Sequence, residues 1–247
     1  MPKAKEIYEY IDSLAPFCKQ EEWDNSGFLI GDENTEVKSV LLALDCTNEV
    51  LEYAKKSGCE LVITHHPIIF GALKQVKVGS EVYTAVNSGL SVICAHTSYD
   101  VAEGGVSDIL AKTLSAENTV KSPSGILTVG EIEKTTVGEY ARLVGKALSA
   151  SVRACLTEKE AKRVAFCGGA GSDYLLEAKE MGCDLLVTGD AGHHDFLDAV
   201  NLNIGLIAAG HFETETISIK PLCDRLQEKF GNVKFTVFEQ KTPITYI

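Results

Sequence analysis

The sequence predicts an α/β protein built from two duplicated α/β repeats with mixed, mostly parallel sheets. Short apolar runs alternate with amphipathic segments along the chain, a pattern that favours parallel strands with helices on the sheet faces. In addition, residues 37–66 align without a gap with residues 161–190, at an offset of 124. Nine of the thirty aligned positions are identical, and the apolar pattern agrees at most of the others. We therefore expect one βαβ-rich unit to occur twice.

The first half of the chain shows the expected alternation most clearly. An amphipathic helix is predicted over residues 3–15 and a strand over 28–30. Thr47 is a suitable N-cap for a helix, and Gly58 is a suitable terminator. The remaining elements predicted in this half are strands 40–45, 60–64 and 90–95, and helices 47–57, 81–87 and 105–114.

The second half repeats this order. A helix is predicted over residues 137–149, before the repeat begins. A second echo follows, because Ala85-Val86-Asn87, a strand and His96-x-x-x-Asp100 correspond to Ala199-Val200-Asn201, a strand and His211-x-x-x-Glu215. The stretch 115–125 is the expected link, and the predicted domains are 1–124 and 125–247.

Composition excludes several classes of protein. With 247 residues the chain can form one or two domains. No apolar run approaches the ~18 residues of a membrane helix, and the N-terminus does not resemble a signal peptide. The net charge of −12 argues against general nucleic-acid binding, although a small anionic substrate remains compatible with a metal site. The eight cysteines form no CxxC pair and are expected to be reduced, so we predict a cytoplasmic protein.

Histidines and carboxylates follow several of the predicted strands. Ligands at strand ends converge on one crevice in an open α/β sheet, and imidazole with carboxylate suits a borderline divalent metal. His96 and Asp100 are four residues apart, as are His211 and Glu215, a spacing that places both members of a pair on one helix face. The sequence therefore predicts a metal site between the repeats, with the ligands His65, His66, Asp100, His211 and Glu215.

Five ligands are more than one catalytic zinc ion uses. They suit two divalent ions about 3.5–4 Å apart, which activate water and polarise a carbonyl, imine or phosphoryl oxygen. The ligand set is compatible with Zn, Fe, Mn, Co or Ni. His96 is predicted to be catalytic, as a residue that moves protons, and is also a possible sixth ligand.

Other motifs leave two interpretations open. His193 and His194 contact either the substrate or the metal ligands, or else they form a polar helix start. The glycines of the 168–173 loop, Gly169 and Gly171, either present N–H groups to an anion or form a tight turn. Asp190 belongs with the candidates for substrate or ligand contacts. Asp24 and Asn25 can line the site or form a turn.

These motifs together resemble the GTP cyclohydrolase I type 2 homolog family, also called the interacting-factor-3-like family. The resemblance covers essentially the whole chain and rests on six motifs: Trp23-Asp24-Asn25-Ser26-Gly27, Ile63-Thr64-His65-His66-Pro67, His96-Thr97-Ser98-Tyr99-Asp100, the 168–173 loop, Gly189-Asp190 with His193-His194, and Gly210-His211 with Glu215. It implies two intertwined repeats, a dinuclear site on the five predicted ligands and a homohexamer. It also implies that this chain lacks the third domain that longer members insert.

The family label implies opening of the GTP purine ring with release of formate. Chemically this fits a metal-dependent hydrolase that acts on a nucleotide or related small molecule. Nothing in the sequence identifies a guanine pocket, and the same ligands suit a metal-dependent phosphoesterase. A non-catalytic metal-binding protein, such as a metal store, a metal chaperone or a regulatory partner, is the interpretation from a different class.

Overall fold

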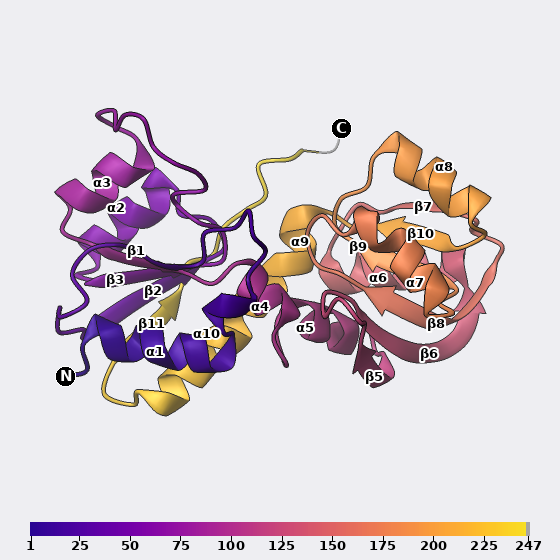
Figure 1. Ribbon diagram of the computed structural model, residues 1–247, viewed down its shortest axis with the longest axis horizontal. Helices are drawn as coiled ribbons and strands as arrows, with labels where there is room; N and C mark the ends of the chain where they lie inside the picture. The colour runs from indigo at the N-terminus through magenta and orange to yellow at the C-terminus, as the bar shows by residue number, and fades with distance from the viewer. Residues whose placement is uncertain (246–247) are drawn as a thin grey trace. The chain divides into compact units, whose positions relative to one another are not determined.

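The computed structural model describes residues 1–245 and divides the chain into two compact units. Unit 1 comprises Met1–Ala102 and Ile219–Lys241, and unit 2 comprises Glu103–Ser218 and residues 242–245. The chain thus leaves unit 1, builds unit 2 and returns to unit 1 near its C-terminus (Figure 1). This return agrees with the intertwined arrangement, and it makes the compact units differ from the sequence repeats 1–124 and 125–247.

Unit 1 contains a five-stranded sheet with the order β1-β4-β3-β2-β11. The strands β4, β3, β2 and β11 are parallel, and β1 is antiparallel to β4. In chain order they are β1 (Gly27–Ile30), β2 (Ser39–Ala43), β3 (Leu61–Thr64), β4 (Ser91–Cys94) and β11 (Lys234–Val237). The helices are α1 (Ala4–Leu14), α2 (Asn48–Lys56), α3 (Glu81–Asn87), α4 (Thr97–Val101) and α10 (Ile219–Lys229), with a 3-10 turn at Phe17–Lys19.

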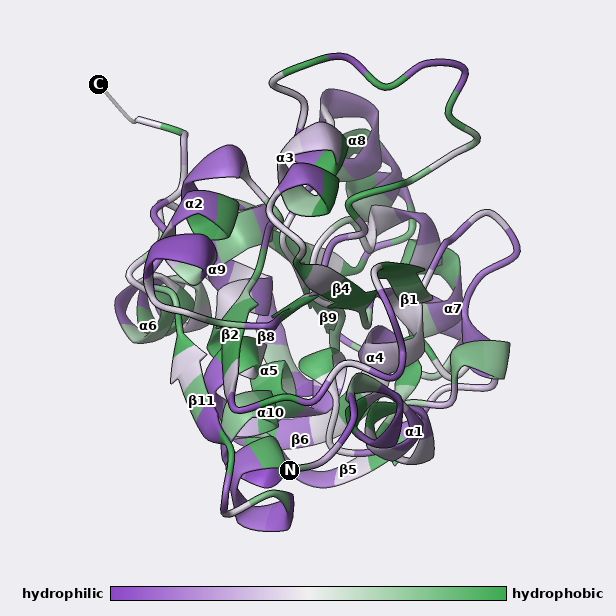
Figure 2. Cartoon of the chain, turned by 90° about the vertical axis from the view of Figure 1, so that its left-hand side faces the viewer, coloured by the Kyte–Doolittle hydropathy of each residue, from purple (hydrophilic) through white to green (hydrophobic). Residues whose placement is uncertain are grey.

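Helices cover both faces of this sheet. Figure 1 shows α2 and α3 on one side, and α1 and α10 on the other. Leu41 and Val62 pack with α2 on the first face, whereas the alternating Leu42 and Ile63 are equally buried on the second. Figure 2 shows the result as hydrophobic strands between helices with hydrophilic outer faces. Burial on both faces explains why these strands read as continuous apolar runs.

Unit 2 contains a six-stranded sheet with the order β5-β6-β8-β9-β10-β7. Its centre, β8-β9-β10, is parallel, and the remaining pairs are antiparallel. The strands are β5 (Glu117–Lys121), β6 (Thr128–Thr136), β7 (Arg153–Cys155), β8 (Glu160–Phe166), β9 (Leu185–Thr188) and β10 (Gly205–Ala208). The helices are α5 (Val106–Thr113), α6 (Val137–Leu148), α7 (Leu175–Glu180), α8 (His193–Asn201) and α9 (His211–Glu215), with 3-10 turns at Ser172–Tyr174 and Thr216–Ser218.

The core of unit 2 lies between its sheet and helices α5 and α6. Leu110 and Tyr140, from these two helices, pack in one cluster with Leu185 and Val187 of β9. Because side chains alternate along a strand, the equally buried Leu186 faces the other side, where Figure 1 places α7 and α8.

The predicted fold class, α/β with two mixed sheets, is confirmed. Helix 81–87 has its predicted bounds, and the Thr47 hydroxyl caps α2 by accepting a hydrogen bond from the Val50 N–H at 3.4 Å. The stretch 115–125 was predicted only as the link between the halves. In the structure it also contains the edge strand β5. That strand is mostly exposed and therefore lacks the apolar pattern of the inner strands.

One structural device occurs at the same place in both repeats. Glu60 accepts hydrogen bonds from the N–H groups of Lys38 and Ser39, both at 3.0 Å. Asp184, at the aligned position, accepts hydrogen bonds from the N–H groups of residues 162 and 163, at 3.0 and 3.1 Å. In each repeat a carboxylate thus ties the start of the second strand, β3 or β9, to the first strand, β2 or β8.

Within the described residues, no helix has the length and apolar composition needed to cross a membrane.

Candidate metal centre

Three histidines cluster in unit 1 at the carboxyl ends of β3 and β4. His65 and His66 follow β3, and His96 follows β4 and caps α4. One ring nitrogen of each histidine lies within 4.8 Å of those of the other two, a separation at which one metal ion can be held. The adjacent His65 and His66 both reach the cluster because the chain bends after the strand: the Thr64 hydroxyl donates to the His66 carbonyl at 2.8 Å.

An oxygen acceptor fixes the Nδ1 atom of each of these histidines. His65 Nδ1–H donates to the Ala95 carbonyl at 2.9 Å, and His66 Nδ1–H donates to Asp45 at 2.7 Å. His96 Nδ1–H donates to Asp24 at 2.7 Å. Because a carbonyl or carboxylate only accepts, each ring holds its proton on Nδ1 and keeps the Nε2 lone pair. Metal-binding histidines are held in this way, so the donor set fits a divalent ion such as Zn, Fe, Mn, Co or Ni.

Asp24 is the most deeply embedded of these acceptors, with a side chain that is 0% exposed. Its other oxygen, Oδ2, accepts hydrogen bonds from the Ser26 hydroxyl at 2.9 Å and from the Thr97 hydroxyl at 2.6 Å. Burial alone would raise the pKa of Asp24, but the hydrogen bonds from His96, Thr97 and Asn25 lower it well below its usual range. Asp24 therefore stays ionised and fixes the His96 ring.

A carboxylate stands beside the unit 1 histidines. Asp100 lies one helical turn after His96 in α4, and its Oδ1 is 3.6 Å from His65 Nε2. Unit 1 therefore brings together four of the predicted residues, His65, His66, His96 and Asp100, in a mixed nitrogen and oxygen set.

Unit 2 contains the second predicted pair at the start of α9. His211 Nε2 lies 3.2 Å from Glu215, and His211 Nδ1 lies 2.7 Å from Asp190. The hydrogen bond to Glu215, opposed by burial and assisted by Asp190, raises the pKa of His211 to about 9. Without a metal ion His211 is therefore protonated at neutral pH, and a metal ion must displace the proton between His211 and Glu215.

The glycine loop of unit 2 lies against this pair. A Cβ atom on Gly169, where φ is +60°, would stand 2.1 Å from Glu215 Oε1, so any other residue there would have to displace the Glu215 carboxylate. The N–H groups of Gly169 and Gly171 donate to the hydroxyls of Thr214 and Thr188, at 3.1 and 2.9 Å. These two N–H groups are engaged within the protein, an arrangement that supports the tight-turn interpretation over an anion cradle.

The remaining candidates lie outside the donor clusters of their units. His193 and His194 are exposed and begin α8, in keeping with a polar helix start. Asn25 holds a loop, since its side-chain amide donates to the Ile69 carbonyl at 2.6 Å.

Sequence reasoning assigned no role to three residues around the histidines. Asp45 orients His66, and Trp23 and Phe70 lie edge-on to His96, with ring centroids 5.9 and 6.1 Å away. Asp45 had a signal that the prediction did not use, because it ends an apolar strand as the histidines do. Phe70 had none, since it lies eleven residues before the first residue of α3 in a loop without periodicity.

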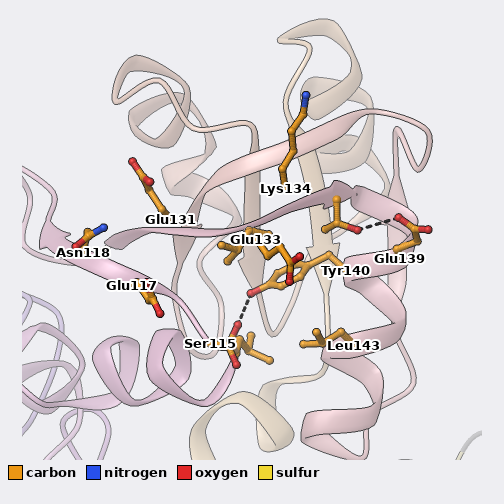
Figure 3. Close-up of a pocket in the computed structure, with 12 residues that line it drawn as sticks. Ser115, Glu117, Asn118, Glu131, Glu133, Lys134, Glu139, Tyr140 and Leu143 are labelled. Carbon is orange, nitrogen blue, oxygen red and sulfur yellow. Dashed lines mark hydrogen bonds between the residues drawn. The ribbon is translucent and has the colours of Figure 1, made fainter.

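A separate cleft of about 780 Å³ opens in unit 2 beside β5, β6 and α6 (Figure 3). Four glutamates line it, together with Lys134 and the ring of Tyr140, whose hydroxyl donates to the Leu114 carbonyl at 2.8 Å. It contains none of the predicted site residues, and its carboxylates disfavour an anionic ligand. The candidate site is therefore the histidine clusters, not this cleft.

Comparison with known proteins places the chain among relatives of the same length. It is 31% identical over 261 aligned positions to a Clostridium perfringens protein named GTP cyclohydrolase 1 type 2 homolog, covering 99% of this chain and 100% of that protein. A Helicobacter pylori protein named GTP cyclohydrolase 1 type 2 is 30% identical, covering 87% of this chain and 88% of that one.

Solved structures agree with the fold. The crystal structure of Staphylococcus aureus protein SA1388 superposes with a TM-score of 0.94 at 28% identity and covers 100% of this chain and 99% of that chain. The model of the family Duf34/NIF3 (NGG1p interacting factor 3) matches residues 2–243. The chain belongs to the Duf34/NIF3 family.

Proposed function

We propose that this protein is a dinuclear divalent-metal-dependent hydrolase that opens the ring of a purine nucleotide, as the name of its Helicobacter pylori relative implies for that protein. In this proposal the five predicted ligands, His65, His66, Asp100, His211 and Glu215, hold the two ions.

A single observation carries the proposal. His65, His66, His211 and the predicted catalytic His96 all have Nδ1 held by an oxygen acceptor, and in three of them the acceptor is a carboxylate: Asp45, Asp24 and Asp190. Carboxylate–histidine pairs raise ligand basicity and fix ring orientation, and both effects serve metal binding. A structural histidine needs no such uniform orientation.

When bound, two divalent ions would supply a nucleophile from water at neutral pH and would polarise the atom under attack. The residues of the chain supply the rest. Asp24 keeps the His96 proton on Nδ1, so His96 Nε2 is free to accept a proton from the reacting water and return it to the leaving nitrogen. Asp100 and Glu215 add negative charge that makes each donor set suitable for a dication.

The test is an incubation of metal-reconstituted protein with GTP, in which the products are resolved by mass spectrometry. The Asp100→Asn variant serves as the control for contaminating activity, because it keeps the side-chain shape but loses the charge. Formate and a pterin triphosphate from the wild type alone would establish the proposal.

Other outcomes would change it. Phosphate or nucleoside products would retain the dinuclear hydrolase and assign it to phosphoester chemistry. Two bound metal ions without turnover would favour a metal store, a metal chaperone or a regulatory partner. Equal activity and equal metal content in Asp100→Asn would contradict the role given to that carboxylate.

The homohexamer and the cytoplasmic location remain predictions. Light scattering of the purified protein tests the first, and a monomer would contradict it.

A further inference from the structure

Two large aromatic side chains are exposed beside the histidine cluster of unit 1. Trp23 is 57% exposed and Phe70 is 55% exposed, although both are apolar enough to favour burial. Their rings stack on each other with centroids 5.7 Å apart and an interplanar angle of 28°. Exposed apolar side chains that gather in one patch, unlike those scattered singly, are candidates for a binding surface.

The same aromatic pair faces His96. The ring of Trp23 lies edge-on to His96 at 5.9 Å and 73°, and that of Phe70 at 6.1 Å and 63°. His96 in turn lies 5.2 Å from His65 and 5.4 Å from His66, measured between ring centroids. A planar group on the exposed face of this pair would therefore lie next to the nitrogen donors.

The loops that hold the two rings are tied together. The Asn25 side chain donates to the Ile69 carbonyl at 2.6 Å, and this bond links the residues next to Phe70 and next to Asp24. Asp24 Oδ1 accepts from the Asn25 N–H and from His96 Nδ1, both at 2.7 Å. Rings that are fixed before binding lose little entropy when a ligand arrives.

The charge of the Phe70 loop favours an anionic ligand. Residues 67–80 contain Lys74 and Lys77 but no aspartate or glutamate, in a chain whose net charge is −12. Both lysines are exposed, and neither side chain forms an ion pair with another described residue.

We infer that Trp23 and Phe70 form a stacking surface for the heteroaromatic ring of a nucleotide, with Lys74 and Lys77 on the side of its phosphates. The ring binds by its π-face, so the surface accepts a purine without a dedicated hydrogen-bonding pocket. The role of this surface in turnover rests on the proposed function, but ring binding itself can be measured without turnover.

Trp23 is the single tryptophan of the chain, so its fluorescence reports directly on this surface. The probes are GTP, guanosine and inorganic tripolyphosphate, each titrated against metal-free and against metal-loaded wild-type protein, with the emission read directly after mixing. We expect GTP and guanosine to quench Trp23, with GTP binding more tightly, and tripolyphosphate to leave its emission unchanged.

Matched variants locate the contact. Phe70→Leu should raise the dissociation constant for GTP and guanosine about 5- to 160-fold, the range that corresponds to the loss of one aromatic–base stack. Phe70→Tyr, which keeps a ring, should restore binding. Tyr53→Leu removes another exposed aromatic of unit 1, which packs on Phe238, and should leave the constant unchanged.

The charge is tested with the double variant Lys74→Gln, Lys77→Gln. It should weaken GTP binding and leave guanosine binding as in the wild type.

Three results would overturn the inference: no quenching by GTP or guanosine in either protein form, equal quenching by tripolyphosphate, or equal affinity in Phe70→Leu and the wild type. Ring-dependent binding without any turnover of GTP by the wild type would support the stacking surface and refute the proposed reaction.

Discussion

The two units use equivalent positions of the repeat for different purposes. Position 66 carries a histidine that is a nitrogen donor in unit 1, whereas the aligned position 190 carries an aspartate that holds the ring of His211. Position 45 carries the aspartate that orients His66, whereas the aligned position 169 is a glycine pressed against Glu215. Duplicated backbones thus carry complementary side chains.

The histidine–carboxylate pairs at the starts of α4 and α9 also differ in their surroundings. The partner of His96, Asp24, comes from the N-terminal segment outside the aligned repeat and is fully buried. The partner of His211, Asp190, comes from within the repeat and is 56% exposed. The ring of His96 is therefore held more firmly than that of His211, because a buried carboxylate with several hydrogen bonds allows its histidine fewer orientations.

The largest expected effect comes from deleting one donor in each unit. In the proposed centre, His65→Ala and His211→Ala should each lower the bound metal from two ions per chain and reduce turnover by more than about 100-fold, since a lost ligand costs more than a lost supporting residue. Metal content is measured by mass spectrometry of the purified, reconstituted variants.

His193→Ala is the matched control, because this histidine is exposed at the start of α8. A full metal content in His211→Ala would remove unit 2 from the proposed centre.

The next effect separates the two supporting carboxylates. Asp24→Asn and Asp190→Asn should each weaken metal binding, by about 10- to 100-fold for a typical supporting residue. Asp24→Asn should lie at the upper end because its carboxylate is buried and accepts several hydrogen bonds, and Asp190→Asn at the lower end. Competition with a chromophoric chelator measures both affinities, and the reverse order would refute the comparison.

A smaller effect concerns Gly169, which occupies the position in unit 2 that aligns with Asp45 of unit 1. Gly58→Ala and Gly169→Ala both force alanine into a positive φ, at +69° and +60°, which costs about 1–2 kcal/mol. Only at Gly169 does the new Cβ also meet Glu215, which adds roughly 1–3 kcal/mol.

Chemical denaturation of the two variants measures this difference. Equal losses in the free energy of unfolding would show that the approach of Glu215 to the loop is not tight.

The smallest effect is the pH dependence of stability in metal-free protein. The pKa of His211 is raised to about 9, so its pair with Glu215 stabilises the fold below the unfolded-state pKa of 6.5 and is lost as pH rises through about 9. Because the His211 side chain is 36% exposed, we expect a melting temperature change of at most ~2–4 °C.

The pKa of Asp24 is lowered, so its contribution is present above pH ~4 and is lost in more acidic solution. Melting curves of the wild type and His211→Gln from pH 2 to pH 10 test the comparison. An unchanged alkaline loss in His211→Gln would assign it to another group.

Much of the architecture could be read from the chain because it follows from local pattern. Apolar runs with turn residues define the inner strands, Thr47 and Gly58 bound α2 within one residue, and the offset of 124 reveals the duplication before any coordinates. The ligand candidates also follow from local pattern, because a histidine directly after a buried strand must lie at the carboxyl end of that strand.

Tertiary structure alone decided which side chains support these donors. Asp24 lies 72 positions from His96, Trp23 stacks on Phe70 47 positions away, and β11 returns from the C-terminus to pair with β2. Strand β5 was not predicted because it is an edge strand that is mostly exposed, so its sequence lacks the alternation of apolar and polar residues. The hydrophobic pattern of each segment reflects which of its faces is buried. Contacts between loops that are distant in the sequence depend instead on how the strands and helices pack together, and no local pattern encodes this packing.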